Sequence, residues 1–271
     1  MRIALLTSVC SKVANRIADI SESHGFAIVD FSDDCRLSFF CKEKHLKHMP
    51  FVSWDDSAKA LAGFDLLVSY KINKLIPMDF VKIFRYGGIN IHPSLLPEYP
   101  GLNPWFHMYC NMELNSGVTV HRIDRKPDSG NIIAQQAFSI EPGQPLPAAM
   151  ETADDIAEQL IVQVLSGGLF LLEGTLQKPK YNYSTNRIQL ESLKKFPTMR
   201  LWHVLRGFPA LIAVLFPELP HRFFEAGEYC LQSQDSSTSG TAHLDIQCSC
   251  IVCFDGVIEL MDFSSITMTQ D

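Results

Sequence analysis

Short apolar runs alternate with helical sequence along the first ninety residues, and this alternation limits the possible folds more than any other feature. The predicted strands cover residues 3–8, 26–31, 66–68 and 88–91, with helical candidates at residues 12–23 and 78–85. Strands that alternate with helices favour βαβ units and a parallel sheet. The pattern predicts a doubly wound α/β domain.

Polar side chains gather at the end of the fourth predicted strand. The sequence INIHPSLLP begins as an apolar strand and breaks at Pro93, because proline lacks a backbone donor. Asn90 and His92 are two positions apart, so they project from the same face of the strand. We therefore expect an amide and an imidazole side by side at the carboxyl end of a strand, where open α/β sheets bind ligands.

The next segment offers a carboxylate to this pair. Residues 117–123 and 131–135 are predicted strands, and the charged loop between them carries Asp128. An Asp close to His92 would favour the imidazolium form. An amide, an imidazole and a carboxylate together suit a reaction that passes through a tetrahedral oxyanion. The chain has no GxSxG elbow, so attack by an amine of the substrate itself is the simplest interpretation.

His121 has two interpretations. It alternates with Val118 and Val120, which share the opposite face of the predicted strand. A role in packing or in supporting the site is at least as consistent with this pattern as a direct one.

The motifs NxHPSLLP, GVTVHRID and DSGNII resemble the folate-dependent formyltransferase family, over roughly residues 1–172. Asn90 and Asp128 are 38 positions apart, as the family's catalytic spacing requires. The resemblance implies a Rossmann-like formyltransferase domain at residues 1–178 that uses 10-formyltetrahydrofolate as co-substrate. It also implies roles for the three side chains. Asn90 would polarise the formyl oxygen, His92 would stabilise the oxyanion and move the proton, and Asp128 would keep His92 charged.

The same resemblance assigns the cofactor and substrate positions. The folate pocket would be lined by the stretch after the third strand and by the loop before Asp128, namely Lys74, Leu75, Ile76, Asp124, Arg125, Lys126 and Pro127. The amine substrate would meet residues just past the catalytic strand, namely Ser94, Tyr99, Asn103 and Trp105. The segment YPGLNPW could instead be a proline-rich turn with Trp105 in the core.

The choice of amine depends on charge and on the first loop. A net charge of −7 and a tail with no Lys/Arg stripe argue against a tRNA acceptor, because phosphate contacts dominate nucleic-acid affinity. The first loop, TSVCSKVAN, lacks the glycines of glycinamide ribonucleotide formyltransferases. The resemblance then leaves a nucleotide-linked amino sugar as the acceptor, one that is used for lipopolysaccharide or another surface polysaccharide. Methionyl-tRNA formyltransferase, formyltetrahydrofolate hydrolase and a non-catalytic folate-binding homologue are the alternatives.

Residues 179–271 predict a small α+β domain after a polar linker. A helix is expected at residues 190–205, strands at 222–230, 243–254 and 257–262, and a tight turn at Asp255-Gly256. The CxCxxC run at Cys248, Cys250 and Cys253 could suggest zinc, but its spacing favours a packed strand and no metal. The resemblance implies a homodimer built partly from this region.

Three further expectations come from composition and pattern. Eight cysteines without the spacing of a disulfide framework favour a reducing, cytoplasmic location. No apolar run reaches the length of a membrane span, and residues 154–172 are predicted as an amphipathic helix. The basic stretch at residues 35–50 is predicted to be a solvated loop or helix face, with a ligand-binding patch as the alternative.

Overall fold

The computed structural model of the chain describes residues 1–21, 25–32, 34–178, 189–217, 224–231, 241–245, 250–253 and 255–262. It divides into two compact units. Unit 1 comprises Met1–Pro104, Ser116–Phe138 and Glu151–Ser184, and unit 2 comprises Trp105–Asn115, Ser139–Met150 and Thr185–Asp271. The catalytic domain was expected to cover residues 1–178 without interruption, but Trp105–Asn115 and Ser139–Met150 belong to unit 2.

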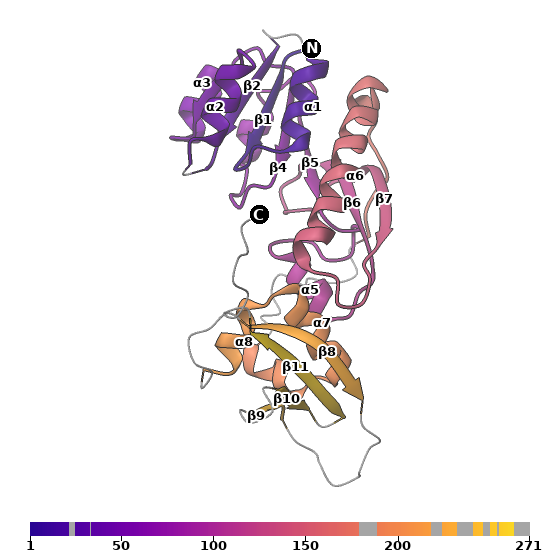
Figure 1. Ribbon diagram of the computed structural model, residues 1–271. Coiled ribbons are helices and arrows are strands. Elements are labelled where there is room, and N and C mark those ends of the chain that lie inside the picture. Colours follow the sequence, from indigo (N-terminus) through magenta and orange to yellow (C-terminus); the bar gives the residue numbers. More distant parts are fainter. Residues whose placement is uncertain are drawn as a thin grey trace. The chain divides into compact units, whose positions relative to one another are not determined.

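Unit 1 is built on a seven-stranded sheet with the order β3-β2-β1-β4-β5-β6-β7. The first five strands pair in parallel and β6 pairs antiparallel with β5. Figure 1 shows β1, β2, β4 and β5 side by side. The strands are β1 (Ile3–Thr7), β2 (Phe26–Asp30), β3 (Lys47–Pro50), β4 (Leu66–Tyr70), β5 (Gly88–His92), β6 (Asn115–Arg122) and β7 (Ile132–Ser139).

Helices cover both faces of this sheet, as a doubly wound fold requires. They are α1 (Lys12–Ile20), α2 (Arg36–Glu43), α3 (Trp54–Ala60), α4 (Met78–Val81) and α6 (Leu146–Ser166), whose first residues, up to Met150, are counted with unit 2. Alternate residues of β1, Ala4 and Leu6, pack in one cluster with residues of α3 and α4. On α1, Lys12 and Arg16 form ion pairs with Asp155 and Glu158 of α6. The prediction of a doubly wound α/β fold is confirmed.

Several elements of unit 1 differ from their predicted form. Residues 35–50 form the helix α2 and the strand β3. The strand was not predicted because its residues are polar, yet it pairs in parallel with β2. α3 was not predicted, although Ser53 caps it by accepting a hydrogen bond from the Asp56 N–H. α6 begins at Leu146, before the predicted start at residue 154, and ends where Gly167 and Gly168 follow.

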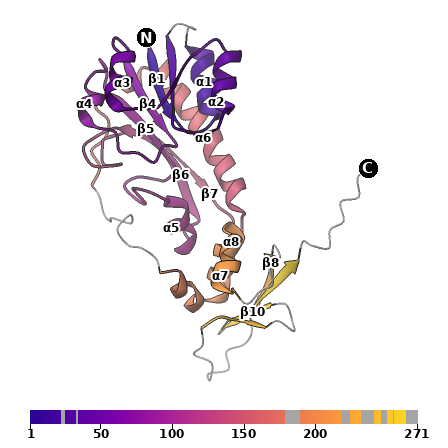
Figure 2. The same cartoon turned by 90° about the vertical axis from the view of Figure 1, so that its left-hand side faces the viewer.

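Unit 2 contains a four-stranded antiparallel sheet with the order β8-β11-β10-β9. Its helices α7 and α8 lie against β8 (Figure 2). The unit contains α5 (Pro104–Cys110), whose first residue is counted with unit 1, the 3₁₀ helix η3 (Leu190–Lys195), α7 (Thr198–Gly207), α8 (Ala210–Leu215), β8 (Phe224–Leu231), β9 (His243–Asp245), β10 (Cys250–Cys253) and β11 (Gly256–Asp262). The short 3₁₀ helix η1 (Leu169–Leu171) follows α6 in unit 1.

The predicted elements of unit 2 are present in modified form. The expected helix at residues 190–205 is split at Pro197 into η3 and α7. The Asp255 carboxylate receives hydrogen bonds from the N–H and the hydroxyl of Thr198, so it caps α7 from another part of the unit. Gly256 is already part of β11 and pairs with Cys253, so it lies in the strand and not in the predicted tight turn.

Some expectations concern residues that lie outside the described ranges. These include much of the linker after residue 178, the middle of the predicted strand 243–254, Phe254 and Cys248. In the described part of the chain, no cluster of three or more His, Cys, Asp or Glu side chains could hold a metal ion. Among the described helices, none has the length and apolar character needed to cross a bilayer.

Candidate active site

A cavity of about 610 Å³ opens at the carboxyl ends of β4 and β5, entirely within unit 1. Its wall includes Ser69 and Tyr70 at the end of β4 and Asn90 and His92 at the end of β5. Both strands belong to the parallel part of the sheet, and open α/β sheets bind their ligands outside the carboxyl ends of such strands. The sequence predicted this location from the position of Asn90 and His92.

Strand register brings a third polar side chain to the same face. Asn90 is directly paired with His121 across β5 and β6, and directly paired residues share a face of the sheet. Val118 and Val120 are buried on the opposite face, as their alternation predicted. The Asn90 Nδ2 donates to His121 Nε2 at 3.1 Å. His121 therefore lies in the polar cluster, which resolves the question that the sequence left open.

Asp128 lies at the centre of the cluster. Its Oδ1 is 3.3 Å from Asn90 Nδ2 and 3.4 Å from His121 Nε2. Its Oδ2 accepts a hydrogen bond from the Gly101 N–H at 2.7 Å and is 3.5 Å from His92 Nδ1. The structure thus brings together the three side chains that the sequence predicted as catalytic, and adds His121 and the Gly101 N–H.

The surroundings of Asp128 decide its charge. Burial alone would raise the pKa of this carboxyl, but the adjacent His121 and His92 side chains and the Gly101 N–H outweigh burial and lower the pKa to about 2. Asp128 is therefore a carboxylate at neutral pH.

Backbone contacts fix the ring of His92. Its Nε2 lies 2.9 Å from the Tyr99 carbonyl oxygen, which can only accept, so Nε2 carries a proton. The other nitrogen, Nδ1, faces Asp128 in the wall of the cavity. In the neutral ring Nδ1 has a lone pair and can accept a proton there.

Burial sets the protonation of His92. The side chain is almost completely buried, and loss of solvation lowers its pKa by more than Asp128 and the Tyr99 carbonyl raise it. Sequence reasoning expected Asp128 to keep His92 charged. The structure instead favours a neutral imidazole that can gain a proton during a reaction.

Most of the predicted cofactor positions line the cavity. These are Lys74, Leu75, Ile76, Asp124, Arg125 and Pro127. Lys126 is exposed and does not line it, and its carbonyl accepts a hydrogen bond from the Ser129 hydroxyl. Leu75 and Leu102 also line the cavity although they are 74% and 61% exposed, so both offer apolar surface to a bound molecule.

The predicted substrate positions separate into different environments. Asn103 lines the cavity, whereas Ser94 is buried and donates to the Glu98 carbonyl. Tyr99 is also buried and contributes its carbonyl to His92. Trp105 is half-buried, lies in α5 and belongs to unit 2.

The loop before α5 has a conformation that the sequence did not reveal. Tyr99, Gly101 and Asn103 all have positive φ, at 54°, 91° and 57°. A glycine suits the middle position, because a φ of 91° lies beyond the range that side chains tolerate well. In this conformation the Tyr99 carbonyl accepts a hydrogen bond from His92, and the Gly101 N–H donates one to Asp128. The hint in the sequence was the glycine that follows Pro100.

In the part of the chain that the structure describes, no hydroxyl or thiol is paired with the His92 imidazole as a nucleophile. Both ring nitrogens of His92 are accounted for among the described residues, one by the Tyr99 carbonyl and one by Asp128. The arrangement can stabilise an oxyanion and transfer a proton, but it leaves nucleophilic attack to a substrate.

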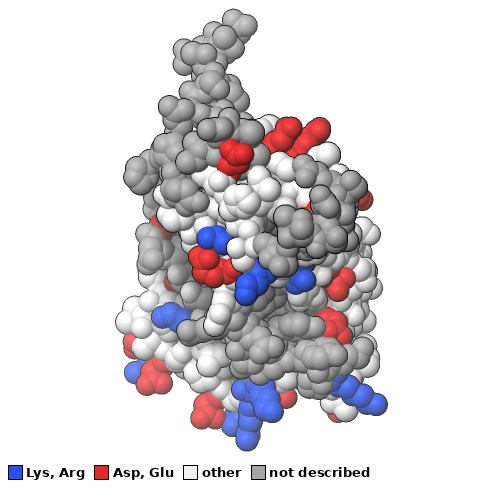
Figure 3. All heavy atoms as spheres, turned by 90° about the horizontal axis from the view of Figure 1, so that it is seen from below, with Lys and Arg blue, Asp and Glu red and all other residues white. Residues whose placement is uncertain are grey.

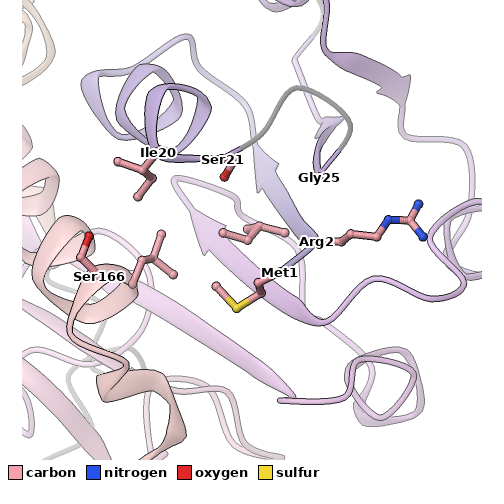
Figure 4. A pocket seen from close by; sticks show the side chains of 8 residues that line it. Met1, Arg2, Ile20, Ser21, Gly25 and Ser166 are labelled. Atoms are coloured by element: carbon pink, nitrogen blue, oxygen red, sulfur yellow. The ribbon is translucent and has the colours of Figure 1, made fainter.

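A second cavity of about 530 Å³ lies at the amino end of β1. Its lining mixes apolar side chains such as Met1, Ile20 and Leu165 with polar ones such as Ser21 and Ser166. Figure 4 shows the Arg2 side chain extending away from the other lining side chains, and its guanidinium donates to the Gly63 carbonyl. The described residues that line this cavity include no cluster of titratable side chains comparable to that around Asp128.

Comparison with known proteins supports an assignment of this site. Residues 51–165, which include the whole polar cluster, match the sequence model of the family described as Formyl transferase. The predicted resemblance to this family is confirmed.

Curated relatives match the same region. Methionyl-tRNA formyltransferase of Borrelia garinii subsp. bavariensis is 36% identical over 107 residues, 40% of this chain and 31% of that protein. GDP-perosamine N-formyltransferase of Brucella melitensis biotype 1 is 39% identical over 77 residues, 28% of this chain and 30% of that protein. The matched segments thus span less than a third of these relatives.

A solved structure is similar over nearly the whole chain. The N-formyltransferase from Helicobacter canadensis, in complex with folinic acid and dTDP-3-aminofucose, has a TM-score of 0.67 and 17% identity. The alignment covers 97% of this chain and 100% of that one. At this identity the likeness establishes a shared fold.

Proposed function

We propose that this protein transfers the formyl group of 10-formyltetrahydrofolate to the amine of a nucleotide-linked amino sugar. The observation that carries the proposal is the position of His92. Its Nε2–H is committed to the Tyr99 carbonyl, and its Nδ1 faces both the cavity and Asp128. Together with the Asn90 amide, this is the set of groups that an amine needs to attack a formyl carbon.

The proposed reaction begins when the lone pair of a neutral substrate amine attacks the formyl carbon and the formyl oxygen becomes an oxyanion. The Asn90 amide nitrogen has two contacts, 3.1 Å to His121 and 3.3 Å to Asp128. The N–H that points at Asp128 makes the longer and weaker contact, so it is the N–H that can turn to the oxyanion. His92 Nδ1 accepts the proton that the attacking nitrogen must lose, and Asp128 stabilises the resulting imidazolium.

The second step returns the proton. As the carbonyl re-forms, the bond from the formyl carbon to N10 of the cofactor breaks, and His92 gives its proton to N10. The products are the N-formyl sugar and tetrahydrofolate, and the protein returns to its starting protonation state.

The cavity suits a folate cofactor. Leu75 and Leu102 offer apolar surface to a flat ring system, and Lys74 and Arg125 place positive charge in the wall. Folate carries an apolar aromatic body and carboxylates, so both kinds of group have a counterpart. Leu75, Ile76 and the loop of residues 124–127 remain the proposed pterin side, with Asn103 on the proposed sugar side.

The surface of unit 2 favours an amino sugar over tRNA. Its described part has four Lys or Arg residues, and three are engaged within the unit. Lys194 pairs with Glu191, Arg200 donates to the Cys110 carbonyl, and Arg206 donates to the Gly143 and Ala226 carbonyls. Figure 3 shows basic and acidic side chains interspersed on one face. A tRNA-binding protein needs unpaired basic groups for phosphates.

The proposal extends to the setting of the reaction. We place it in the cytoplasm, with a homodimer as the working form and a surface polysaccharide such as lipopolysaccharide as the destination of the sugar. Sedimentation of the purified protein would test the dimer separately from the activity.

A transfer assay tests the proposed function. The protein is incubated with 10-formyltetrahydrofolate and a panel of nucleotide-linked 3-amino and 4-amino sugars, with initiator methionyl-tRNA as a competing acceptor. We expect one sugar nucleotide to gain a formyl group as tetrahydrofolate appears. Formylation of the tRNA alone would refute the sugar assignment, and formate release without an acceptor would indicate a hydrolase.

A further inference from the structure

The turn that carries Asp128 has an unusual backbone. Asp128 has a φ of 53°, in the left-handed region that non-glycine residues seldom occupy. Two residues later, a side chain at Gly130 would place its Cβ 1.9 Å from the Arg122 carbonyl oxygen. The turn therefore passes directly against β6, and other contacts must hold it in this conformation.

A buried amide from a distant part of the sequence supplies such contacts. The Gln177 Nε2 donates to the Asp128 carbonyl at 3.1 Å and to the Gly130 carbonyl at 2.6 Å. Gln177 is 7% exposed, so water cannot easily replace it. A primary amide has two N–H groups, and here each can serve one carbonyl on either side of Ser129.

The segment that presents Gln177 is itself anchored to the sheet. Thr175 and Ile132 exchange both backbone hydrogen bonds, at 2.7 and 2.9 Å. Upstream, the Arg122 guanidinium donates to the carbonyls of Phe170 and Leu172. The backbone just before Gln177 is therefore anchored by hydrogen bonds, and Gln177 holds the turn of Asp128 from this anchored segment.

We infer that Gln177 is a positioning residue for the reaction, one that acts through Asp128 and does not touch a substrate. It fixes the backbone from which the Asp128 carboxylate reaches His92, His121 and the Gly101 N–H. This inference rests on the proposed function for its kinetic consequences. Its structural consequence, an altered Asp128–His92 contact, can be measured without activity.

The kinetic test compares Gln177→Leu and Gln177→Asn with Leu176→Ala. Leu fills similar space without donors, whereas Asn keeps the amide but is one methylene shorter. Leu176 is the adjacent residue and is 73% exposed, so its variant is the matched control. We expect kcat to fall about 10- to 100-fold in Gln177→Leu and less in Gln177→Asn, because small displacements of a catalytic group are costly. KM for both substrates should change less than about twofold, and Leu176→Ala should behave as wild type.

A double variant separates positioning from general structural damage. If Gln177 acts through the Asp128 carboxylate, Gln177→Leu should have little further effect on kcat in an Asp128→Asn background. Equal losses in both backgrounds would overturn the inference, as would unchanged kcat in Gln177→Leu.

A readout without substrate distinguishes this inference from the proposed function. The ring of His92 is titrated by NMR in wild type and in Gln177→Leu, with Leu176→Ala as control. We expect the midpoint to move to lower pH in Gln177→Leu, because a displaced carboxylate stabilises the imidazolium less. A shifted midpoint in a protein that transfers no formyl group would refute the function and keep the positioning role. An unchanged midpoint would refute the positioning role.

Discussion

Two buried histidines, one in each unit, use their ring nitrogens in opposite ways. His92 in unit 1 donates from Nε2 to the Tyr99 carbonyl, which leaves Nδ1 beside Asp128. His203 in unit 2 accepts at Nδ1 from the Gly143 N–H, and its Nε2 has no hydrogen-bond partner among the described residues. The backbone partner therefore determines which ring nitrogen carries the proton. The surroundings of the other nitrogen determine whether the ring can take part in proton transfer.

The surroundings of the two rings complete the contrast. His203 stacks on Tyr109 with ring centroids 4.4 Å apart and an angle of 5° between the planes. Burial lowers the pKa of His203 to about 4, so the ring is held neutral by its apolar packing. Burial also lowers the pKa of His92, but there a carboxylate is available to stabilise the charged form when a proton arrives. Burial alone thus makes a structural histidine, and burial beside a carboxylate and a cavity makes a candidate base.

The largest expected effect follows removal of the reacting groups. His92→Ala and Asn90→Ala should each lower kcat by about 10² to 10³-fold or more, because one loses the proton carrier and the other an oxyanion donor. Turnover is measured as tetrahydrofolate formed, and circular dichroism checks the fold. His45→Asn is the matched control, since His45 is exposed and asparagine tolerates its φ of 54°. Near-normal turnover in either variant would remove that residue from the mechanism.

Replacing Asp128 by Asn tests the carboxylate with little change in shape, and asparagine also tolerates positive φ. Asp128 raises the pKa of His92, so its loss should lower that pKa further. The acid limb of the pH–rate profile should move to lower pH while kcat falls, because the imidazolium formed in the reaction loses its partner. In the wild type this limb should already lie below the ordinary histidine value of about 6.5. A profile unchanged by the substitution would contradict the role of Asp128.

A smaller effect, on stability, is expected at His203. Its pKa is about 4 in the folded protein and about 6.5 when unfolded, so the unfolded chain binds the proton first as pH falls. The free energy of unfolding should therefore decrease from pH 6.5 to 4, by up to roughly 3 kcal/mol from this residue. His203→Gln should weaken this pH dependence in denaturant titrations and leave formyl transfer at neutral pH intact. Equal pH dependence in both proteins would show that His203 is not held neutral by the fold.

The sequence predicted what depends on local periodicity. The strands of unit 1 other than β3 follow from short apolar runs, and the shared face of Asn90 and His92 follows from two-residue alternation. Asp128 was expected from the charged loop between two predicted strands. His121 was left open because its place beside Asn90 depends on the pairing register of β5 and β6. The Gly101 N–H and Gln177 were missed because loop backbone and long-range contacts set their positions. The charge of His92 was wrongly expected, since burial cannot be estimated from one strand.

The most direct test of the proposed chemistry is the ring state of His92 at neutral pH. Protein labelled with ¹⁵N in its histidine rings is measured by NMR, and the His92 signals are assigned by their loss in His92→Gln. The account predicts a neutral ring with the proton on Nε2 and a bare Nδ1 that is ready to accept the proton of an amine. A ring protonated at Nδ1 at neutral pH, whether neutral or charged, would contradict it.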